Sequence, residues 1–279
     1  YHKMTQADPT NPSQANDKWA LITGASAGLG ATFAQQLAAA GYSLVLIARR
    51  EPQLQQLQQQ LVSEHGIKCE YLAIDLSQPD ANQRIHRFCQ DQNITIHTLI
   101  NNAGYGVPGD FDSQTWPTHQ DSLQVMLLSL TELCHLFYPD MKSRQSGQII
   151  NVASLAGLTP STAGHTLYGA IKSFVIRFSH SLHLEAKDAG VHVTALCPGF
   201  TYTEFHDVNG TRSMVNQMSK KLWMTADEVV QQGLQAVGQN RPVYINGWRN
   251  KLIALITRIL PDRVIRFLMK GSIAKYRKR

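Results

Sequence analysis

Short apolar segments alternate along this chain with longer segments in which apolar residues recur every three or four positions. Each short segment is a run of mostly apolar residues bounded by polar residues, Gly or Pro, and is therefore expected to form a strand. These predicted strands are 19–23, 43–48, 69–74, 97–101, 148–152, 191–197 and 242–245. Helices are expected at about 29–40, 52–65, 80–91, 116–142, 165–189 and 225–238. A loop with short helical pieces is expected at 199–224.

This regular alternation of strands and helices favours an α/β fold. The strands are almost continuously apolar, which is typical of parallel strands buried on both faces. We therefore predict a single domain built on a doubly wound, parallel, seven-stranded Rossmann-like sheet with right-handed crossovers. In such a sheet a ligand binds beyond the carboxyl ends of the strands, near the reversal of strand order.

A glycine-rich turn follows the first predicted strand, where the first helix begins. It is Thr23-Gly24-Ala25-Ser26-Ala27-Gly28-Leu29-Gly30. Gly24 can make a tight turn, Gly28 lets the backbone approach a phosphate, and Gly30 lets the helix pack closely on the sheet. Free N–H groups at the helix N-terminus attract a pyrophosphate. We expect this turn, with Ser26 and Leu29, to bind a dinucleotide; the alternative is a glycine-rich turn without a ligand.

Three further motifs stand at later strands and helices. They are Asn101-Asn102-Ala103-Gly104 after the fourth strand, Tyr168-x-x-x-Lys172 in the predicted helix 165–189, and Pro198-Gly199 after the sixth strand. Together with the spacing G-x-x-x-G-x-G, they resemble the short-chain dehydrogenase/reductase family over about residues 18–247. The resemblance implies an oxidoreductase with a nicotinamide cofactor. It also implies cofactor contacts by Asn102, Ala103, Gly104, Pro198, Gly199 and Thr203.

The end of the second predicted strand indicates which nicotinamide is used. Enzymes that bind NAD usually carry an acid there for the ribose 2′-hydroxyl, whereas this strand ends Ile47-Ala48-Arg49-Arg50. A guanidinium suits a 2′-phosphate because it is planar, always charged and bidentate. We therefore predict NADP(H), with Arg49 as the first candidate and Arg50 as the second. Asp75, followed by Leu76, matches the family position beside the adenine; its alternative role is a turn cap.

Tyr168 and Lys172 are four residues apart on a predicted helix and so share one face. A neighbouring ammonium and a cationic nicotinamide are expected to lower the pKa of the phenol from its usual value of about 10. Tyr168 can then act as acid or base. The resemblance implies that Lys172 tunes Tyr168 and binds the nicotinamide ribose. The alternative is an ordinary aromatic–lysine contact.

Ser154 follows the fifth predicted strand and matches the family serine that hydrogen-bonds the substrate oxygen. Its separation from Tyr168 is one residue longer than is usual in the family, and we place the insertion at 160–164. Ser154 is favoured over Ser161 because it stands at the strand end; its alternative role is a loop-capping hydroxyl.

A second departure lies in the long predicted helix 116–142. The family often has an Asn there that helps to hold a proton-relay water, and our alignment places Met126 at that position. Met can neither donate nor strongly accept a hydrogen bond. Either the relay differs, turnover is slow or absent, or the alignment is shifted and Gln124 or Ser129 takes the place.

The formal net charge of +6 is concentrated near the end of the sequence. Residues 249–279 carry ten Lys or Arg and one acid, a net +9, which leaves −3 for the rest. No nucleic-acid-binding motif accompanies these cations, so nucleic acid is not predicted as a partner. Residues 248–279 are expected to form a basic amphipathic helical extension, divided at Pro261. Two interpretations of this extension stay open. The favoured one is that it packs on the protein or on a partner subunit; the other is that it lies on an anionic membrane surface.

Composition sets the remaining expectations. Residues 1–17 are rich in Pro, Asn, Gln and Asp, and a flexible segment is predicted there ahead of the dinucleotide-binding and catalytic domain at 18–247. No apolar run is long enough for a transmembrane helix. The four cysteines have neither paired nor metal-type spacing, so free thiols, no metal and a cytoplasmic location are expected. The family resemblance suggests a homodimer or homotetramer.

Apolar and aromatic residues in the loops after strands four, five and six suggest a mainly apolar substrate, although they could also pack on one another. These residues are Tyr105, Val107, Leu155, His165, Phe200, Tyr202 and Phe205, of which His165 is favoured as a surface residue. The predicted function is an NADPH-dependent oxidoreductase that interconverts a small-molecule carbonyl and alcohol. Two alternatives stay open: a weakly active or inactive dinucleotide sensor or scaffold, and an acyl-chain reductase at a membrane.

Overall fold

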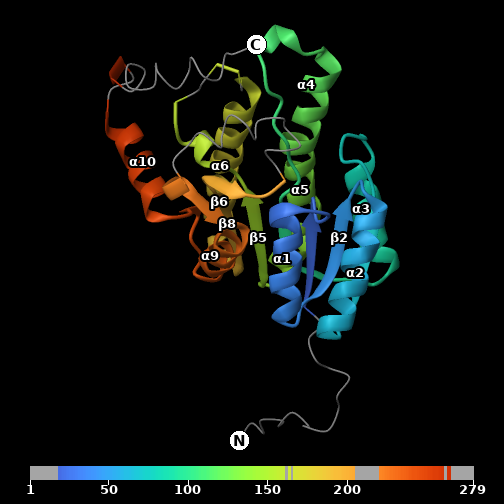
Figure 1. Ribbon diagram of the computed structural model, residues 1–279. Helices are drawn as coiled ribbons and strands as arrows, with labels where there is room; N and C mark the ends of the chain where they lie inside the picture. The colour runs from blue at the N-terminus through green and yellow to red at the C-terminus, as the bar shows by residue number, and fades with distance from the viewer. Residues whose placement is uncertain (1–17, 161–162, 165, 205–219, 261–262, 265–279) are drawn as a thin grey trace, which may run out of the picture.

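Seven parallel strands form one sheet with helices on both faces (Figure 1). The computed structural model describes residues 18–160, 163–164, 166–204, 220–260 and 263–264. The order of the strands is β3-β2-β1-β4-β5-β6-β9, so the direction of winding reverses between β1 and β4. The predicted doubly wound α/β fold is confirmed.

The sheet strands lie close to the segments predicted from apolar runs. They are β1 Trp19–Thr23, β2 Ser43–Ala48, β3 Cys69–Ala73, β4 Ile96–Asn101, β5 Gly147–Val152, β6 Val191–Cys197 and β9 Val243–Ile245. The helices are α1 Gly28–Ala39, α2 Glu51–His65, α3 Ala81–Asp91, α4 Trp116–Leu123, α5 Leu130–Ser143, α6 Thr166–Ala186, α9 Ala226–Gly238 and α10 Trp248–Ile259.

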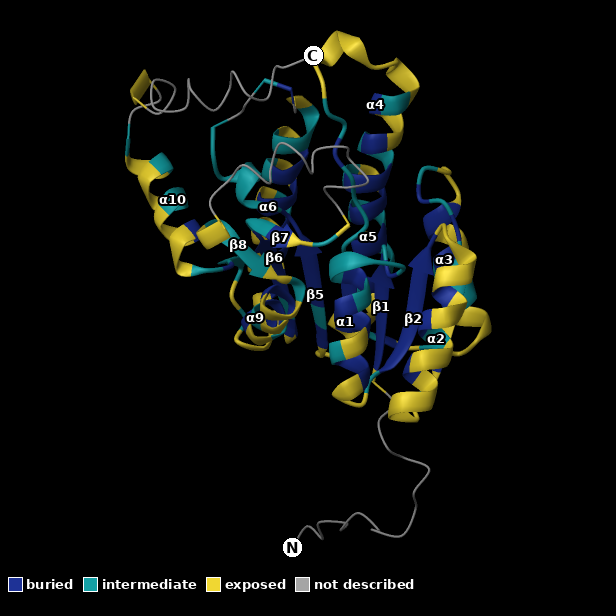
Figure 2. Ribbon diagram, in the orientation of Figure 1, coloured by how far each residue is buried: buried dark blue, intermediate teal, exposed yellow. Residues whose placement is uncertain are grey.

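Alternate side chains of each central strand enter two separate cores, because successive residues of a strand point to opposite faces. In β1, Ile22 joins the core under α1, α2 and α9, whereas Leu21 joins the core under α3, α5 and α6. Both side chains are fully buried, and the central strands are dark throughout in Figure 2. This two-sided burial explains why the strands are continuous apolar runs rather than alternating ones.

Two local features differ from the sequence-based expectation. The predicted helix 116–142 is α4 and α5 joined by a π-helical turn at Gln124–Ser129. The predicted loop 199–224 contains two short parallel strands, β7 Phe200–Tyr202 and β8 Trp223–Thr225, which pair with each other. Three-residue strands are too short to show periodicity, so the sequence pattern could not reveal them.

Several predicted features lie outside the described residues. They are the flexible segment 1–17, the residues Ser161, His165, Phe205 and Pro261, and the chain from 265 onward. Within the described part of the chain, no helix has the length and apolar content needed to cross a membrane.

Candidate active site

The carboxyl ends of β1 and β4 meet at the point where the strand order reverses. Hydrogen bonds hold these two strand ends together. The backbone N–H groups of Asn102 and Ala103, which follow β4, donate to Thr23 Oγ1 at the end of β1, at 3.0 and 3.1 Å. The Asn102 amide also donates to the Thr23 carbonyl at 3.0 Å. The Asn-Asn-Ala-Gly motif is therefore held directly beside the glycine-rich turn.

The glycine-rich turn has no room for side chains at two of its glycines. A Cβ on Gly30 would lie 2.1 Å from the Gly24 carbonyl oxygen, and Gly24 itself has φ +67°, a conformation that glycine adopts readily. Among the described residues, no side chain caps the start of α1, and its first turn contains no acid. The N–H groups and positive end of α1 thus fit a pyrophosphate, and a dinucleotide suits this turn.

The two arginines at the end of β2 point to different neighbours. Arg50 donates to Ser26 Oγ in the glycine-rich turn at 3.2 and 3.3 Å and pairs with Glu204 at 3.4 Å. Arg49 lies 4.0 Å from the Asp75 carboxylate, with two thirds of its side chain exposed. Both guanidinium groups therefore border the space beyond the end of β2, where the ribose of a dinucleotide held by this turn would lie.

Asp75 also accepts a hydrogen bond from the backbone N–H of Ser77 at 3.0 Å. The turn-capping role considered for this residue is therefore present. The adjacent Leu76 is buried in the core rather than exposed to a ligand, with 6% of its surface accessible. Their contacts with a cofactor stay predictions.

Ser154, Tyr168 and Lys172 come together after β5 and at the start of α6. Tyr168 is hydrogen-bonded to Ser154. The Lys172 ammonium lies 5.7 Å from the centre of the Tyr168 ring and donates to the Val152 carbonyl at 2.7 Å. One strand end and one helix face thus bring a hydroxyl, a phenol and an amine to a single point.

Ser154 performs two tasks. Its Oγ accepts a hydrogen bond from the Ala156 N–H at 3.1 Å and so caps the short helical turn Leu155–Gly157. Since that bond uses the oxygen as an acceptor, the hydroxyl hydrogen is free to be donated to Tyr168 or to a substrate oxygen. The capping and catalytic interpretations of Ser154 are therefore compatible.

Burial dominates the acid–base properties of the pair. It raises the pKa of Tyr168 to about 12, while the hydrogen bond with Ser154 acts in the opposite direction. It lowers the pKa of Lys172 to about 8. In the chain by itself the pKa of the phenol is raised rather than lowered, because desolvation dominates. The lowering expected with both the ammonium and a bound cationic nicotinamide stays a prediction.

Met126 lies near Lys172 at the edge of the Asn-Asn-Ala-Gly motif, and its equivalence to the family Asn stays a prediction. A Cβ on Gly104 would be 3.1 Å from Met126 Sδ and 3.7 Å from Lys172 Nζ, so the sulfur and the amine border the same glycine. Ser129 faces away, because its hydroxyl donates to Asn82 at 2.8 Å. Met126 is almost fully buried within the π-helical turn, a deviation that occurs often at functional sites.

A match to a known family decides the class of this protein. The family described as short chain dehydrogenase matches residues 18–213. The chain belongs to that family. The resemblance inferred from the glycine spacing and the Tyr168–Lys172 pair is thereby confirmed, and with it the assignment to the oxidoreductases.

Similar proteins span most of this short-chain dehydrogenase. Very-long-chain 3-oxoacyl-CoA reductase-A of Danio rerio is 29% identical over 250 residues, 87% of this chain and 76% of that protein. The 17-beta-hydroxysteroid dehydrogenase type 3 of Mus musculus is 29% identical over 265 residues, 94% and 82% of the two chains. A solved short-chain dehydrogenase from Sphingobium yanoikuyae, in complex with NADPH, has a TM-score of 0.77 and 31% identity, covering 91% and 95%.

The loops after β4, β5 and β6 contribute the apolar residues expected around a substrate. Tyr105, Val107 and Leu155 are half-buried. Phe200 and Tyr202 instead pack on Trp223, with ring centres 5.6 and 4.6 Å apart. The alternative that these aromatic residues pack on one another is therefore correct for Phe200 and Tyr202. The pairing of β7 with β8 brings both rings to Trp223.

The sequence analysis did not identify several residues of this short-chain dehydrogenase that position the site through hydrogen bonds or close packing. The Thr23 hydroxyl accepts a hydrogen bond from the Ala103 N–H after β4, and the Val152 carbonyl accepts one from the Lys172 ammonium. Asn250 on α10 is 3% exposed and lies against Gly199, on which a Cβ would be 2.5 Å from the Asn250 amide. A lone Asn in a tail of apolar and basic residues was the only signal for that contact.

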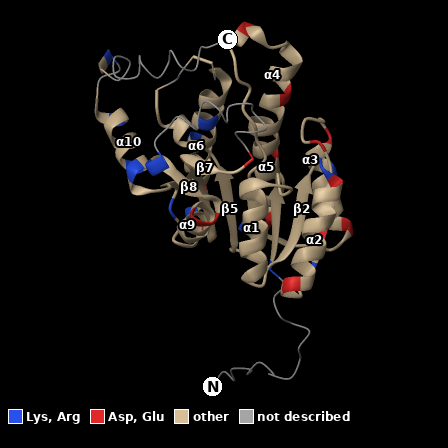
Figure 3. Cartoon of the chain, in the orientation of Figure 1, with Lys and Arg blue, Asp and Glu red and all other residues tan. Residues whose placement is uncertain are grey.

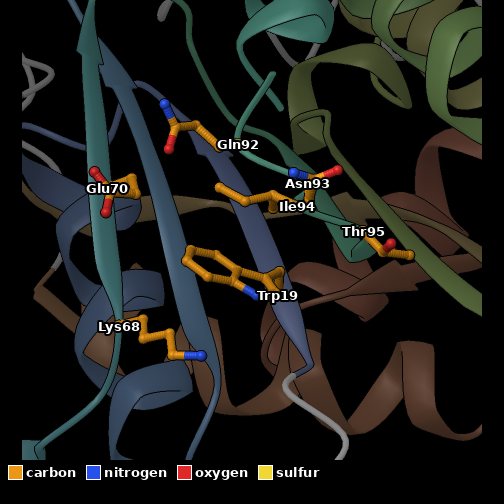
Figure 4. Close-up of a pocket in the computed structure, with 7 residues that line it drawn as sticks. All are labelled: Trp19, Lys68, Glu70, Gln92, Asn93, Ile94 and Thr95. Carbon is orange, nitrogen blue, oxygen red and sulfur yellow. The ribbon is translucent and has the colours of Figure 1, made fainter. Parts of the chain in front are cut away.

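A hollow lies at the end of the sheet opposite the candidate active site, where the strands begin (Figure 4). Its lining is Trp19, Lys68, Glu70, Gln92, Asn93, Ile94 and Thr95. None of the predicted site residues borders it, and in folds of this kind the ligand binds at the carboxyl ends of the strands. It does not belong to the candidate active site.

Proposed function

We propose that this short-chain dehydrogenase interconverts a carbonyl and an alcohol on a mainly apolar small molecule, using NADP(H). The observation that carries the proposal is the convergence of Ser154, Tyr168 and Lys172 beside Gly104 of the Asn-Asn-Ala-Gly motif. A phenol and an amine on one helix face, with a hydroxyl from a strand end, supply an acid, a cation and a hydrogen-bond donor at one point.

When bound, the nicotinamide supplies the hydride for reduction. Tyr168 donates its phenolic proton to the carbonyl oxygen, which takes the electron pair of the C=O π bond and becomes a hydroxyl. Ser154 donates a hydrogen bond to the same oxygen and stabilises its developing charge. The Lys172 ammonium stabilises the phenolate that remains. A pKa of about 12 keeps Tyr168 protonated at neutral pH, as an acid must be for this direction.

Charge at the end of β2 supports NADP(H) rather than NAD(H). Arg49 and Arg50 stand where an acid would bind the ribose 2′-hydroxyl, and the solved Sphingobium relative is a complex with NADPH. We expect the unmodified protein to bind NADPH at least about tenfold more tightly than NADH, the size of one charge-assisted hydrogen bond.

Binding titrations with Arg49→Ala and Arg50→Ala test this cofactor choice. Each change should weaken NADPH about tenfold and leave NADH nearly unchanged. Arg84→Ala is the matched control, because Arg84 is an exposed arginine of α3 paired with Asp80. Equal binding of both nucleotides by the unmodified chain would defeat the assignment.

The proposed substrate is a bulky ketone or its alcohol. Half-buried Tyr105, Val107 and Leu155 support an apolar pocket. The similar proteins are named for steroid and very-long-chain acyl substrates. A screen of steroid, 3-oxoacyl and smaller ketones, following the loss of NADPH, tests the activity. Turnover confined to small polar carbonyls would contradict the substrate class.

The alternative of a dinucleotide sensor is favoured by one observation, the thioether of Met126 beside Lys172. The same screen separates the two functions. Turnover of any ketone supports the enzyme, and tight NADPH binding without turnover supports the sensor.

A further inference from the structure

Helix α10 has two opposite faces. One face is turned toward the protein and contains Asn250, Ile253, Ala254 and Thr257, which are buried or half-buried. The other face exposes five large apolar side chains. They are Trp248, Leu252, Leu255, Ile256 and Ile259, with between 42% and 69% of their surface accessible. In an ordinary surface helix the outward face is polar, so this pattern is inverted.

The exposed side chains form a continuous stripe. At about 100° per residue, they span an arc of roughly 100° opposite the protein-facing residues. Arg249 lies at one edge of this stripe, next to Ile256, while Lys251 and Arg258 lie at the other edge, next to Leu255. Residues 248–260 contain no Asp or Glu. We call this surface, consisting of the five apolar residues and the three cations, the α10 stripe.

Contacts within the protein fix the helix and two of its cations. The Arg249 guanidinium lies 4.5 Å from the centre of the Trp248 ring and donates to the Lys221 carbonyl. The Lys251 ammonium lies 4.8 Å from the centre of the Tyr244 ring. Because the buried Asn250 amide also donates to the Asn246 carbonyl at 2.8 Å, the stripe cannot turn inward without breaking a buried hydrogen bond.

We propose that the α10 stripe docks on the surface of a bilayer that contains anionic lipids. An apolar stripe bordered by cations is the arrangement of helices that lie in the membrane interface, with apolar side chains among the acyl chains and cations at the headgroups. The cations and anionic lipids attract each other, and α10 carries no acid to oppose that attraction. Figure 3 shows basic residues on this side of the molecule, away from α2 and α3.

A second copy of this chain suits the stripe less well. In a two-fold symmetric contact the same surface packs on itself. Cations border the stripe on both edges, so Arg249, Lys251 and Arg258 of two copies would come close together without a carboxylate of α10 between them. Repulsion between like charges opposes that pairing, whereas a headgroup phosphate neutralises the same cations.

Helix α10, which carries the stripe, also contacts the segment that follows Ser154. The Thr257 hydroxyl is 3.5 Å from the Leu158 carbonyl, in the segment that follows Ser154. Thr257 is on the protein-facing side of α10, so a bilayer docked on the opposite face lies one helix diameter, roughly 10 Å, from that segment. The docking itself does not depend on the proposed activity, and the two can fail separately.

Vesicle flotation of the full chain tests the proposal. We expect binding to phosphatidylcholine vesicles that contain phosphatidylglycerol. The pair Leu255→Gln and Ile259→Gln should weaken that binding by roughly tenfold or more, because two apolar side chains no longer leave water. Leu184→Gln is the control: Leu184 is 60% exposed on α6, outside the stripe, and its replacement should change nothing. The further cations of 265–279 are intact in both variants.

The cations are tested separately. Lys251→Gln with Arg258→Gln should lower the affinity for anionic vesicles by roughly fivefold per residue, and high salt should have the same effect. Lys142→Gln with Lys187→Gln is the matched control, since both of these lysines are exposed on other elements. Binding to pure phosphatidylcholine as strong as to the mixed vesicles would overturn the role of charge.

Insertion is measured through Trp248. Brominated lipids should quench tryptophan fluorescence, and Trp248→Phe should abolish most of that quenching, because Trp248 is the only tryptophan in the stripe. Equal flotation of the unmodified chain and the Leu255→Gln, Ile259→Gln pair would overturn the proposal. So would a halved molecular mass of that pair in the absence of any vesicle binding, which would identify the stripe as a contact between two copies.

Discussion

At the scale of single residues, the buried Lys172 ammonium lowers the free energy of unfolding, because burial disfavours its charge. Its side chain is 5% exposed, and its hydrogen bond to the Val152 carbonyl only partly compensates for the lost hydration. The pKa of about 8, against 10.5 for a free lysine, indicates that the folded state disfavours the ammonium. At any pH where Lys172 is charged in the folded protein, this shift corresponds to a loss of about 3 kcal/mol in the free energy of unfolding.

Lys172→Met should therefore stabilise the fold while it removes activity. Below pH 8 both states of the unmodified chain are protonated and the full penalty applies, so the variant should gain between about 1 and 3 kcal/mol at pH 7. Between pH 8 and 10.5 only the unfolded state holds the proton, so the stability of the unmodified chain rises with pH and the gain shrinks.

Urea unfolding at pH 7 and pH 10 measures this gain. Lys142→Met, at an exposed lysine of α5, should be close to neutral at both pH values. A loss of stability in Lys172→Met at pH 7, or a gain of the same size at pH 10, would contradict the account.

Ser154 should act on both the rate and the pH profile. Ser154→Ala removes a donor to the substrate oxygen, and kcat should fall by about 10²- to 10³-fold. Because the Ser154 hydrogen bond lowers the pKa of Tyr168, its loss should also shift the ascending limb of the pH profile of alcohol oxidation, where the phenol loses its proton, to higher pH. Ser63→Ala, at an exposed position on α2, is the control. A lower rate with an unmoved pH limb would indicate that Ser154 only caps its loop.

At the scale of elements, the π-helical turn at Gln124–Ser129 is held by a polar cluster between α3 and α5. The buried Asn82 amide donates to Glu132 at 2.7 Å and accepts from Ser129 at 2.8 Å. Exposed Gln83 donates to the same carboxylate at 2.9 Å. Met126 lies three residues before Ser129 in the same π-helical turn, so the cluster helps to fix the position of the thioether beside Lys172.

Asn82→Ala should destabilise the fold by about 1 to 3 kcal/mol, since it leaves two polar partners unsatisfied in or near the core. Gln83→Ala should cost less than about 0.5 kcal/mol, because water replaces an exposed hydrogen bond. Urea unfolding of the two variants side by side makes the comparison. Equal losses would show that the buried cluster has no special part in holding the turn.

The sequence revealed the elements that follow one simple period and missed those that do not. Continuous apolar runs located all seven sheet strands, and glycine spacing located the phosphate-binding turn. The π-helical turn has the same apolar period as the helices around it, so nothing in Leu123–Leu130 distinguishes it from an α-helix. The raised pKa of Tyr168 was also beyond reach, because burial depends on tertiary packing that no local pattern encodes.

At the scale of the whole molecule, the strand order assembles residues that are far apart in sequence. Thr23 ends β1, while Asn102, Ser154 and Gly199 follow β4, β5 and β6, and all four lie at the same edge of the sheet. A ligand that spans this edge contacts several crossovers at once. Its binding free energy therefore adds to the stability of the entire fold.

NADPH should accordingly protect the protein against unfolding more than NADH does. At a free concentration 100 times its dissociation constant, a ligand that binds only the folded state adds about 2.7 kcal/mol. Urea or thermal unfolding with each nucleotide at the same concentration gives the comparison. The same midpoint with NADPH as without nucleotide would argue against any dinucleotide site at this edge.

The central claim is that the Tyr168 phenol transfers a proton at the reactive end of a bound nicotinamide. The most direct measurement compares kcat on a ketone found by the screen, and the Kd for NADPH, in the unmodified chain and in Tyr168→Phe. We predict that kcat falls by about 10²- to 10⁴-fold while the Kd stays within a few-fold. Retained turnover in Tyr168→Phe, at an unchanged Kd, would contradict the claim.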